Sequence, residues 1–247
     1  MQAAKENIIT QLKKDILRLE GFKSPAKGKK LNFGLGMLES AFPYGVFPDA
    51  AVHEFLCDGE EDAAATNGFL ATLLSILMQN GQSCIWISPF PQVFPPALEN
   101  FGIHPDRVIF IQLRRDRDIL WAMEEALKCS GLVAVVAELQ ELTFAQSRRL
   151  QLAVENNQIT GFVLRKDNKK ISTTACVARW RISHLPSFSE KDLPGVGFPQ
   201  WQVELLKVKN GQPSIWKAIH TPEALVVKSS ETDGALLPDS LTIKTGT

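Results

Sequence analysis

Four acidic residues, Asp58, Glu60, Glu61 and Asp62, occupy the segment in which a phosphate-binding loop would be expected. Residues 56–66 (LCDGEEDAAAT) separate a short apolar run from a helical pattern, which is where a phosphate-binding loop is found in many α/β proteins. Such a loop follows G-x-x-x-x-G-K-[ST] and aims backbone N–H groups and one lysine at phosphate oxygens. Here Gly59 is the one glycine, and no lysine occurs between residues 54 and 128. Because carboxylates repel a polyanion, we expect this loop not to bind ATP.

No other set of reactive side chains indicates catalysis or a metal site. The four cysteines lie far apart without a C-x-x-C pair or a neighbouring histidine, so we expect reduced, buried thiols and no metal. His184, Ser187 and Asp192 could suggest a hydrolase triad, but they fall in an expected loop and no G-x-S-x-G is present. We therefore expect no catalytic residue and no cofactor.

Charge and composition indicate a soluble globular protein. The 27 basic and 27 acidic side chains cancel, so any surface for nucleic acid or membrane must be local. Hydrophobic residues make up 45% of the 247 positions, which is enough for a sizeable core. No apolar run approaches the ~20 residues that a membrane span needs, and the N-terminus lacks an apolar signal-peptide core. We expect a cytoplasmic location.

The pattern predicts a central domain with an appendage at each end. Residues 1–30 are expected to hold an amphipathic helix over 2–20 and a lysine-rich tether. Residues 31–220 form the expected domain, and residues 221–247, rich in Ser, Thr, Asp, Gly and Pro, are predicted to be a flexible tail or a segment that folds on a partner.

The central domain alternates short apolar runs with helical patterns. Near-continuous apolar strands separated by helices are typical of a parallel sheet covered on both faces, so the fold class is α/β. Residues 174–182 and 201–208 instead alternate polar and apolar side chains, which predicts late antiparallel strands. The other expected strands are 51–56, 83–88, 107–111, 131–139 and 160–164, and the expected helices are 61–79, 118–128 and 143–156.

The order of these elements resembles the core of bacterial RecA over residues 31–220. The resemblance implies a RecA-like core that lacks its phosphate-binding loop. It rests on residues 31–36 (LNFGLG), 82–88 (QSCIWIS), 101–108 (FGIHPDRV), 126–136 (ALKCSGLVAVV) and 206–211 (LKVKNG).

Within that superfamily the chain is similar to the ImuA family. The matching motifs are residues 118–127 (DILWAMEEAL), 147–155 (SRRLQLAVE) and 160–165 (TGFVLR). This resemblance implies a non-enzymatic accessory protein of a mutagenic translesion-synthesis complex, induced by DNA damage as part of the SOS response. It implies two partners, an ImuB-like protein related to Y-family polymerases and a DnaE-type error-prone polymerase.

The departures from RecA fall on positions that its ATP chemistry needs. The phosphate-binding lysine aligns with Thr66, or with Ala65 if the alignment slips, and neither side chain neutralises a phosphate. Pro89 follows a strand where a catalytic base should stand, and proline is no base. Ala137 replaces the magnesium-binding aspartate, while Glu138, one position on, points to the opposite face of the strand. We expect Glu138 to pair with a basic residue or a helix N-terminus.

Lys166, Lys169 and Lys170 are candidate DNA contacts. They follow the strand 160–164 and, by the resemblance, take the place of the mobile DNA-contacting loop of RecA. Lysines there could contact phosphates electrostatically. The alternative is a solvated basic loop without a DNA role.

The N-terminal helix is predicted to be a docking element. Ile8, Leu12, Ile16 and Leu19 form one apolar stripe, and the tether that follows does not fix this helix to its own core. An exposed aliphatic stripe is costly to leave in water, so it should seek a groove. By the resemblance it could dock on another copy of the chain, but a partner in the mutagenic complex is the interpretation we favour.

Two other functions remain open. One is a degenerate RecA-type ATPase, against which the missing lysine argues. The other is an inhibitor of cell division resembling SulA, which shares this shortened core and binds the tubulin-like division protein. Nucleotide binding separates the first from an accessory role, and a neighbouring gene for a Y-family-like protein would argue against the second.

Overall fold

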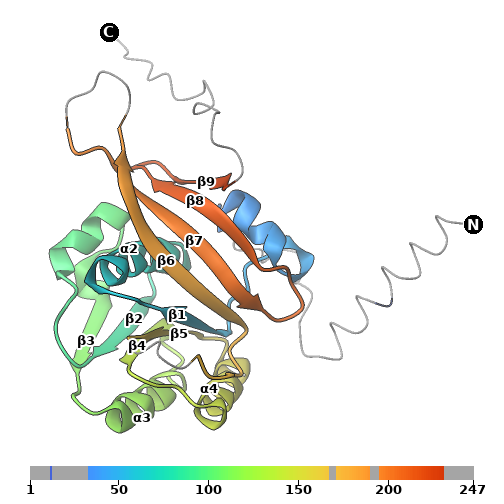
Figure 1. Ribbon diagram of the computed structural model, residues 1–247. Coiled ribbons are helices and arrows are strands. Elements are labelled where there is room, and N and C mark those ends of the chain that lie inside the picture. The colour runs from blue at the N-terminus through green and yellow to red at the C-terminus, as the bar shows by residue number, and fades with distance from the viewer. Residues whose placement is uncertain (1–11, 13–32, 167–170, 190–194, 231–247) are drawn as a thin grey trace, which may run out of the picture.

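A single mixed sheet organises the molecule (Figure 1). The computed structural model describes Leu12 and residues 33–166, 171–189 and 195–230. In this part of the chain the strands lie in the order β3-β2-β4-β5-β1-β6-β7-β8-β9, with helices packed on both faces of the parallel half. The α/β class with a RecA-like, largely parallel core is confirmed.

The parallel half follows the predicted alternation of strands and helices. Each strand from β1 to β5 pairs in parallel with its neighbours in the sheet. The bounds are β1 Val52–Leu56, α2 Glu60–Leu77, β2 Ser83–Ser88, η3 Pro95–Phe101, η4 Pro105–Arg107, β3 Val108–Gln112, α3 Asp116–Ala126, β4 Leu132–Leu139, α4 Phe144–Asn157 and β5 Thr160–Arg165.

Two hydrophobic cores lie on the two faces of this sheet. On one face α2 buries Phe69, Leu70 and Leu73 against strand residues such as Trp86 and Phe162. On the other face α3 and α4 bury their own apolar stripes against the alternate strand positions. The central strands are therefore buried on both sides, which explains their near-continuous apolar sequences.

The antiparallel half extends the sheet beyond β1. Strand β6 pairs in parallel with β1 and antiparallel with β7, so it joins the two halves. Two short 3-10 helices, η1 Gly36–Ala41 and η2 Pro43–Gly45, precede β1, and η1 contacts β9. The antiparallel strands are β6 Ala178–Phe188, β7 Phe198–Val208, β8 Ser214–His220 and β9 Leu225–Ser229.

Strands β6 and β7 are longer than the sequence predicted. Pro186 and Pro199 fall between the expected strands 174–182 and 201–208, but they lie inside β6 and β7. Between the pairs Leu185–Gln200 and Phe188–Phe198, two residues of β6 face one residue of β7. A bulge of this kind accommodates prolines, which have no N–H to give to the ladder.

The predicted start of the flexible tail, residue 221, is wrong. Leu225–Ser229 form β9 and pair antiparallel with β8, so the ordered sheet continues past residue 220. The rest of that tail, 231–247, lies outside the described residues. The N-terminal helix and tether also lie outside them, except Leu12, which is 56% exposed.

Candidate functional site

The loop from β1 to α2, residues 57–59, leads into a helix whose first turn consists of acidic residues. Gly59 is the N-cap of α2, and Glu60, Glu61 and Asp62 fill its first turn. Carboxylates at this position stabilise the positive end of the helix macrodipole. The same N-terminus would attract an anion such as phosphate, so the chain supplies its own anions where a ligand's would lie.

The loop before α2 and the first turn of α2 contact β6 through one arginine–carboxylate ion pair and two histidine–carboxylate contacts. Arg181 Nε lies 2.9 Å from an oxygen of Asp58. The ring nitrogens of His184 lie 3.1 Å from Glu61 Oε2 and 3.1 Å from Asp62 Oδ1. His184 therefore holds the start of α2 against the sheet. His184 and Ser187 both lie in β6, so the loop that we expected around them is wrong.

The two positions that align with the phosphate-binding lysine are buried. Thr66 is fully buried in α2, and its hydroxyl donates to the Asp62 carbonyl at 2.7 Å. The Cys57 thiol in turn donates to Thr66 Oγ1 at 3.7 Å. Ala65 is 5% exposed. Burial raises the pKa of the Cys57 thiol to about 11, so this thiol stays protonated at neutral pH.

Glu138, at the end of β4, is paired as predicted. Its carboxylate accepts a hydrogen bond from Trp86 Nε1 at 3.1 Å and lies 2.9 Å from Lys166 Nζ. Lys166 also donates to Gln92 Oε1 at 2.7 Å. Ala137 and Glu138 face opposite sides of the sheet, and Glu138 faces the side of α2. The carboxylate is thus compensated by a protein cation.

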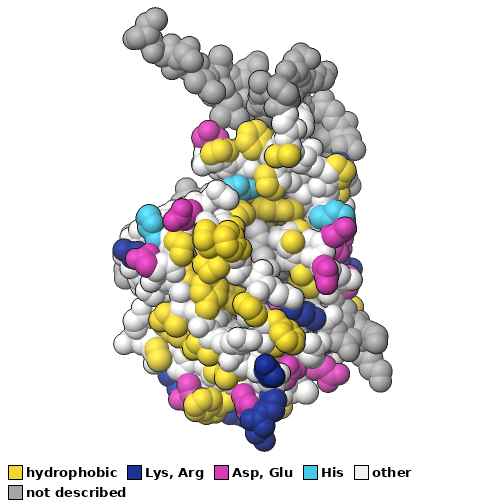
Figure 2. Space-filling view, turned by 90° about the vertical axis from the view of Figure 1, so that its left-hand side faces the viewer, with side chains coloured by type: hydrophobic (Ala, Val, Ile, Leu, Met, Phe, Trp, Pro, Cys, Tyr) yellow, Lys and Arg dark blue, Asp and Glu magenta, His cyan; other side chains and the backbone are white. Residues whose placement is uncertain are grey.

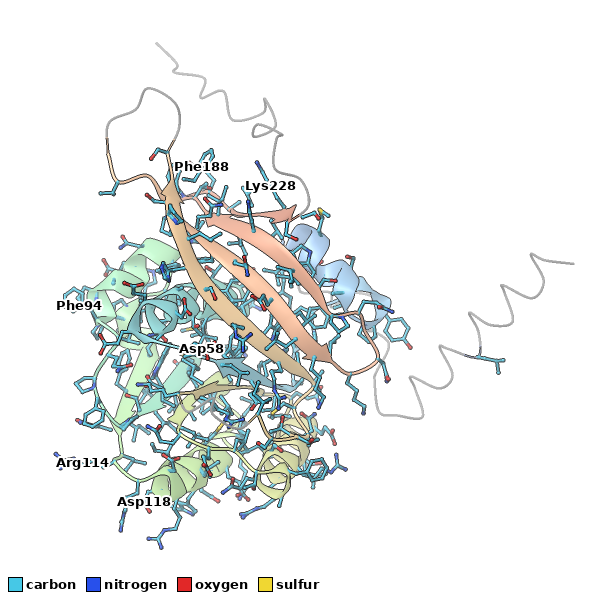
Figure 3. All side chains as sticks on the ribbon, in the orientation of Figure 1. Asp58, Phe94, Arg114, Asp118, Phe188 and Lys228 are labelled. Carbon is cyan, nitrogen blue, oxygen red and sulfur yellow. The ribbon has the colours of Figure 1, made fainter. Side chains whose placement is uncertain are left out.

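A groove of about 760 Å³ lies beside the acidic loop. One wall is α2, which presents Ala63, Ala64, Asn67, Gly68 and Ala71. Asp58 and Phe94, labelled in Figure 3, both line it. The other wall is η3 and the segment before it, with Gln92, Val93, Phe94, Ala97, Leu98 and Phe101, while Lys166 lies at one end.

A buried charge network at the centre of the sheet was not predicted. Glu54 of β1 is fully buried and lies 2.9 Å from Arg165 Nη1 and 2.8 Å from Arg179 Nε. Thr174 Oγ1 donates to the same carboxylate at 2.8 Å. Charged residues inside otherwise apolar strands were the signal that could have found this network. The network links the three neighbouring strands β1, β5 and β6, close to the carboxyl end of β1 where the loop to α2 begins.

Comparison with known proteins decides the family. No family model matches the chain. Over 198 residues the chain is 32% identical to Protein ImuA of Caulobacter vibrioides, in strains NA1000 and CB 15, which covers 75% of this chain and 81% of that protein. The chain belongs to the ImuA family. It is also 27% identical over 110 residues to the cell division inhibitor SulA of Photorhabdus laumondii, covering 43% of this chain and 62% of SulA.

The candidate DNA contacts of this ImuA-family chain are only partly placed. Lys166 is held by Glu138 and Gln92, which compensates part of its charge. Arg165, the residue before Lys166, is 2% exposed and belongs to the Glu54 network. Lys169 and Lys170 lie outside the described residues. The DNA-contact hypothesis therefore stays a prediction.

The candidate docking stripe lies mostly outside the described residues as well, since Leu12 is its one described member. Among the described residues no cluster of three or more His, Cys, Asp or Glu could hold a metal ion. In the same part of the chain no helix is both long and apolar enough to cross a membrane. Cys129 is exposed, so the expectation of four buried thiols is wrong at this position.

Proposed function

We propose that this ImuA-family chain is a non-catalytic accessory protein of an error-prone translesion DNA synthesis complex induced by DNA damage, and that it works by binding other proteins. Family membership supports the broader part of this proposal, a DNA-damage-related accessory role. The acidic residues at the place of the phosphate-binding loop, paired within the chain, support the non-catalytic part.

Three features of the site argue against ATP. The first turn of α2 holds three carboxylates, which would repel the triphosphate. Thr66, in the lysine position, is buried, donates its hydroxyl to the Asp62 carbonyl and does not line the groove. Among the described residues, Lys166 is the one lysine that lines the groove, and it is already paired with Glu138. A bound nucleotide would have to break that pair and leave a carboxylate that is 1% exposed without its cation.

Exposed apolar side chains support protein binding. Figure 2 shows hydrophobic side chains gathered in a band on the face that carries η3 and β3. Large contiguous apolar surfaces of this kind mark interaction sites. The partners we propose are an ImuB-like protein related to Y-family polymerases and a DnaE-type error-prone polymerase. Exposed large hydrophobic side chains in the segments around η3 and β3 are Phe90 at 61%, Phe94 at 69%, Ile109 at 49% and Phe110 at 40%.

Affinity purification after DNA damage tests this function. The full-length chain, tagged and expressed at its natural level, should recover the Y-family-related protein and the DnaE-type polymerase, and ATP depletion of the lysate should not reduce the recovery. A double change of Ile109→Ser and Phe110→Ser should lower recovery, whereas Trp121→Ser, which removes an even more exposed aromatic from α3, is the control. Recovery of neither polymerase-like protein would contradict the proposal.

The similarity to SulA favours a second candidate, an inhibitor of cell division. This function would act through a tubulin-like division protein. Overexpression without DNA damage then gives filamentous cells, and the same purification recovers the division protein. The alignment covers 43% of the chain, against 75% for ImuA, so the accessory role is the stronger proposal.

A further inference from the structure

We propose that the groove between α2 and η3 receives a helix of a partner protein, which carries apolar side chains on one face and a lysine or arginine at the end that lies near Glu60. The inference rests on the proposed function and deepens it, because it names the surface that takes the partner and the chemistry that the partner must present. The groove begins at the loop after β1, where a phosphate-binding loop is expected, but the first turn of α2 is acidic.

The wall that α2 contributes is a strip of small side chains along one face of the helix. Its members recur every three to four residues, the spacing of neighbours on a helix surface. From position 60 to position 71 the strip covers 11 steps of about 1.5 Å, or about 16 Å. Small side chains let the backbone of a second helix come close. The strip consists of Ala63, Ala64, Gly68 and Ala71, with Asn67 among them.

The wall that η3 contributes supplies larger apolar contacts. Phe94, Ala97, Leu98 and Phe101 line it at the same spacing. Phe94 is 69% exposed and Leu98 is 5% exposed, so this wall runs from an open rim to a buried floor. A Cβ atom at Gly68 of α2 would lie 3.5 Å from Phe101 Cζ, so the two walls meet at that point. A concave apolar surface between two helical walls is a recurrent receptor for an amphipathic helix.

Asn67 offers a polar contact in the middle of the groove. Its amide oxygen is buried, and among the described residues no group donates a hydrogen bond to it. A buried acceptor without a donor costs free energy. A side chain of the partner helix that donates to this oxygen removes the cost and fixes the position of that helix along the groove.

The charge at the start of the groove favours a basic partner. Glu60 lines the groove and is exposed, and no ion pair within the described part of the chain engages it. The side chain of Asp58 is 40% exposed beside Arg181. Lys166 also lines the groove, but Glu138 compensates its charge. A lysine or arginine of the partner therefore meets carboxylates at this end, whereas phosphate groups would meet repulsion.

The groove continues into the apolar surface that supports the proposed function. Phe94 lines the groove and is also one of the exposed apolar side chains around η3 and β3. Figure 2 shows hydrophobic side chains running in a band over this face. A partner that covers the band therefore has its next contact in the groove, and one interface uses both.

Calorimetric titration of the purified full-length chain with each of the two proposed partners tests the inference. Ala64→Arg fills the groove from an exposed position of α2 and adds a positive charge, so it should weaken the binding of at least one partner at least about tenfold. Glu60→Lys should weaken the same binding and reduce its dependence on salt. Ala145→Arg, at an exposed position in the first turn of α4, is the matched control and should leave the affinity unchanged. Should Ala64→Arg fail to fold, Phe94→Ser tests the opposite wall from an exposed position.

A photo-crosslinker identifies the segment that occupies the groove. Benzoylphenylalanine at position 97, in the η3 wall, should link to a partner segment that has apolar residues at helical spacing and a lysine or arginine, and the same group at position 145 should not. If the wild type binds neither partner, the proposed function and the inference fail together. Partner binding that Ala64→Arg and Phe94→Ser leave unchanged, or a crosslink to an acidic segment, overturns the inference alone.

The same titrations test two other occupants. If Leu12→Asp with Ile16→Asp strengthens partner binding, the N-terminal segment of the chain competes for the groove. If Mg-ATP competes with the partner, a nucleotide does. Either result overturns the inference, which predicts no effect of the double change and none of Mg-ATP.

Discussion

At the residue scale, the buried carboxylate of Glu54 should be the most sensitive position in the sheet. Its two arginines come from β5 and β6, and each lies within 3 Å of one of its oxygens. Breaking a buried pair from one side leaves uncompensated charge and costs about 3–5 kcal/mol. Glu54→Ala should therefore lower the free energy of unfolding by about that amount.

Urea denaturation measures this change directly. Glu60→Ala, which removes an exposed carboxylate at the start of α2, serves as control and should change stability by less than about 1 kcal/mol. Equal stabilities for the two variants would mean that the Glu54 network is not a structural requirement of the fold.

His53 should make the fold sensitive to acid. Burial lowers the pKa of His53 to about 4. A hydrogen bond from His53 Nε2 to the Pro48 carbonyl at 2.8 Å opposes this shift only in part. The other ring nitrogen, Nδ1, accepts a hydrogen bond from Trp180 Nε1. The unfolded chain takes up a proton near pH 6.5 and the folded chain does not until about pH 4. Stability is thus full above pH 6.5 and falls as the pH drops toward 4, by about 3 kcal/mol.

The measurement is the free energy of unfolding against pH for the wild type and His53→Phe. The variant should have a flatter slope between pH 6.5 and 4. His220, half-buried with a lowered pKa, contributes in the same direction in both proteins, so only the difference reports on His53. Parallel curves would contradict the buried, neutral state of this ring.

The residue-scale features could be predicted only in part from the sequence. The pairing of Glu138 with a base was expected, because a lone carboxylate at the end of a buried strand needs compensation. The partners of Glu54 were not, since they lie 111 and 125 residues away and a one-dimensional pattern does not say which strands are neighbours. The burial of Thr66 and the size of the groove also depend on packing that only the structure gives.

At the element scale, the parallel strands were the easiest to predict and the sheet edge the hardest. Strands β2 and β4 are buried apolar runs bounded by turns, and they appear where expected. The ends of β6 and β7 were misplaced because Pro186 and Pro199 read as loop residues, whereas a bulge accommodates them. β9 was missed because its three apolar residues, 225–227, are too few to indicate a strand without the neighbouring β8.

Strand β9 should contribute to the stability of the sheet. It pairs with β8 from Leu225 to Ser229 and contacts η1, so it covers an edge that would otherwise present open backbone groups. A chain ending at residue 221 should be less stable than one ending at residue 230 by about 2 kcal/mol or more. Thermal unfolding of the two truncated proteins checks this. Identical melting temperatures would mean that residues 221–230 do not stabilise the sheet.

At the scale of the whole molecule, the parallel half of the sheet is consistent with a RecA-like core, and an acidic first turn of α2 follows the loop after β1. The parallel half, the two helical layers and the position of the loop after β1 all followed from hydrophobic patterns. The identity of a binding partner does not follow from them, because it depends on the shape and charge of exposed residues such as Phe94 and Phe110.

The central claim is that the protein acts by binding other proteins without a nucleotide. Calorimetric titration of the purified ImuB-like partner into the full-length chain, with and without Mg-ATP, tests it most directly. We predict no heat of binding from Mg-ATP alone, and partner affinities that agree within about threefold in the two conditions. Saturable binding of Mg-ATP to the chain, or partner binding that requires it, would contradict the account.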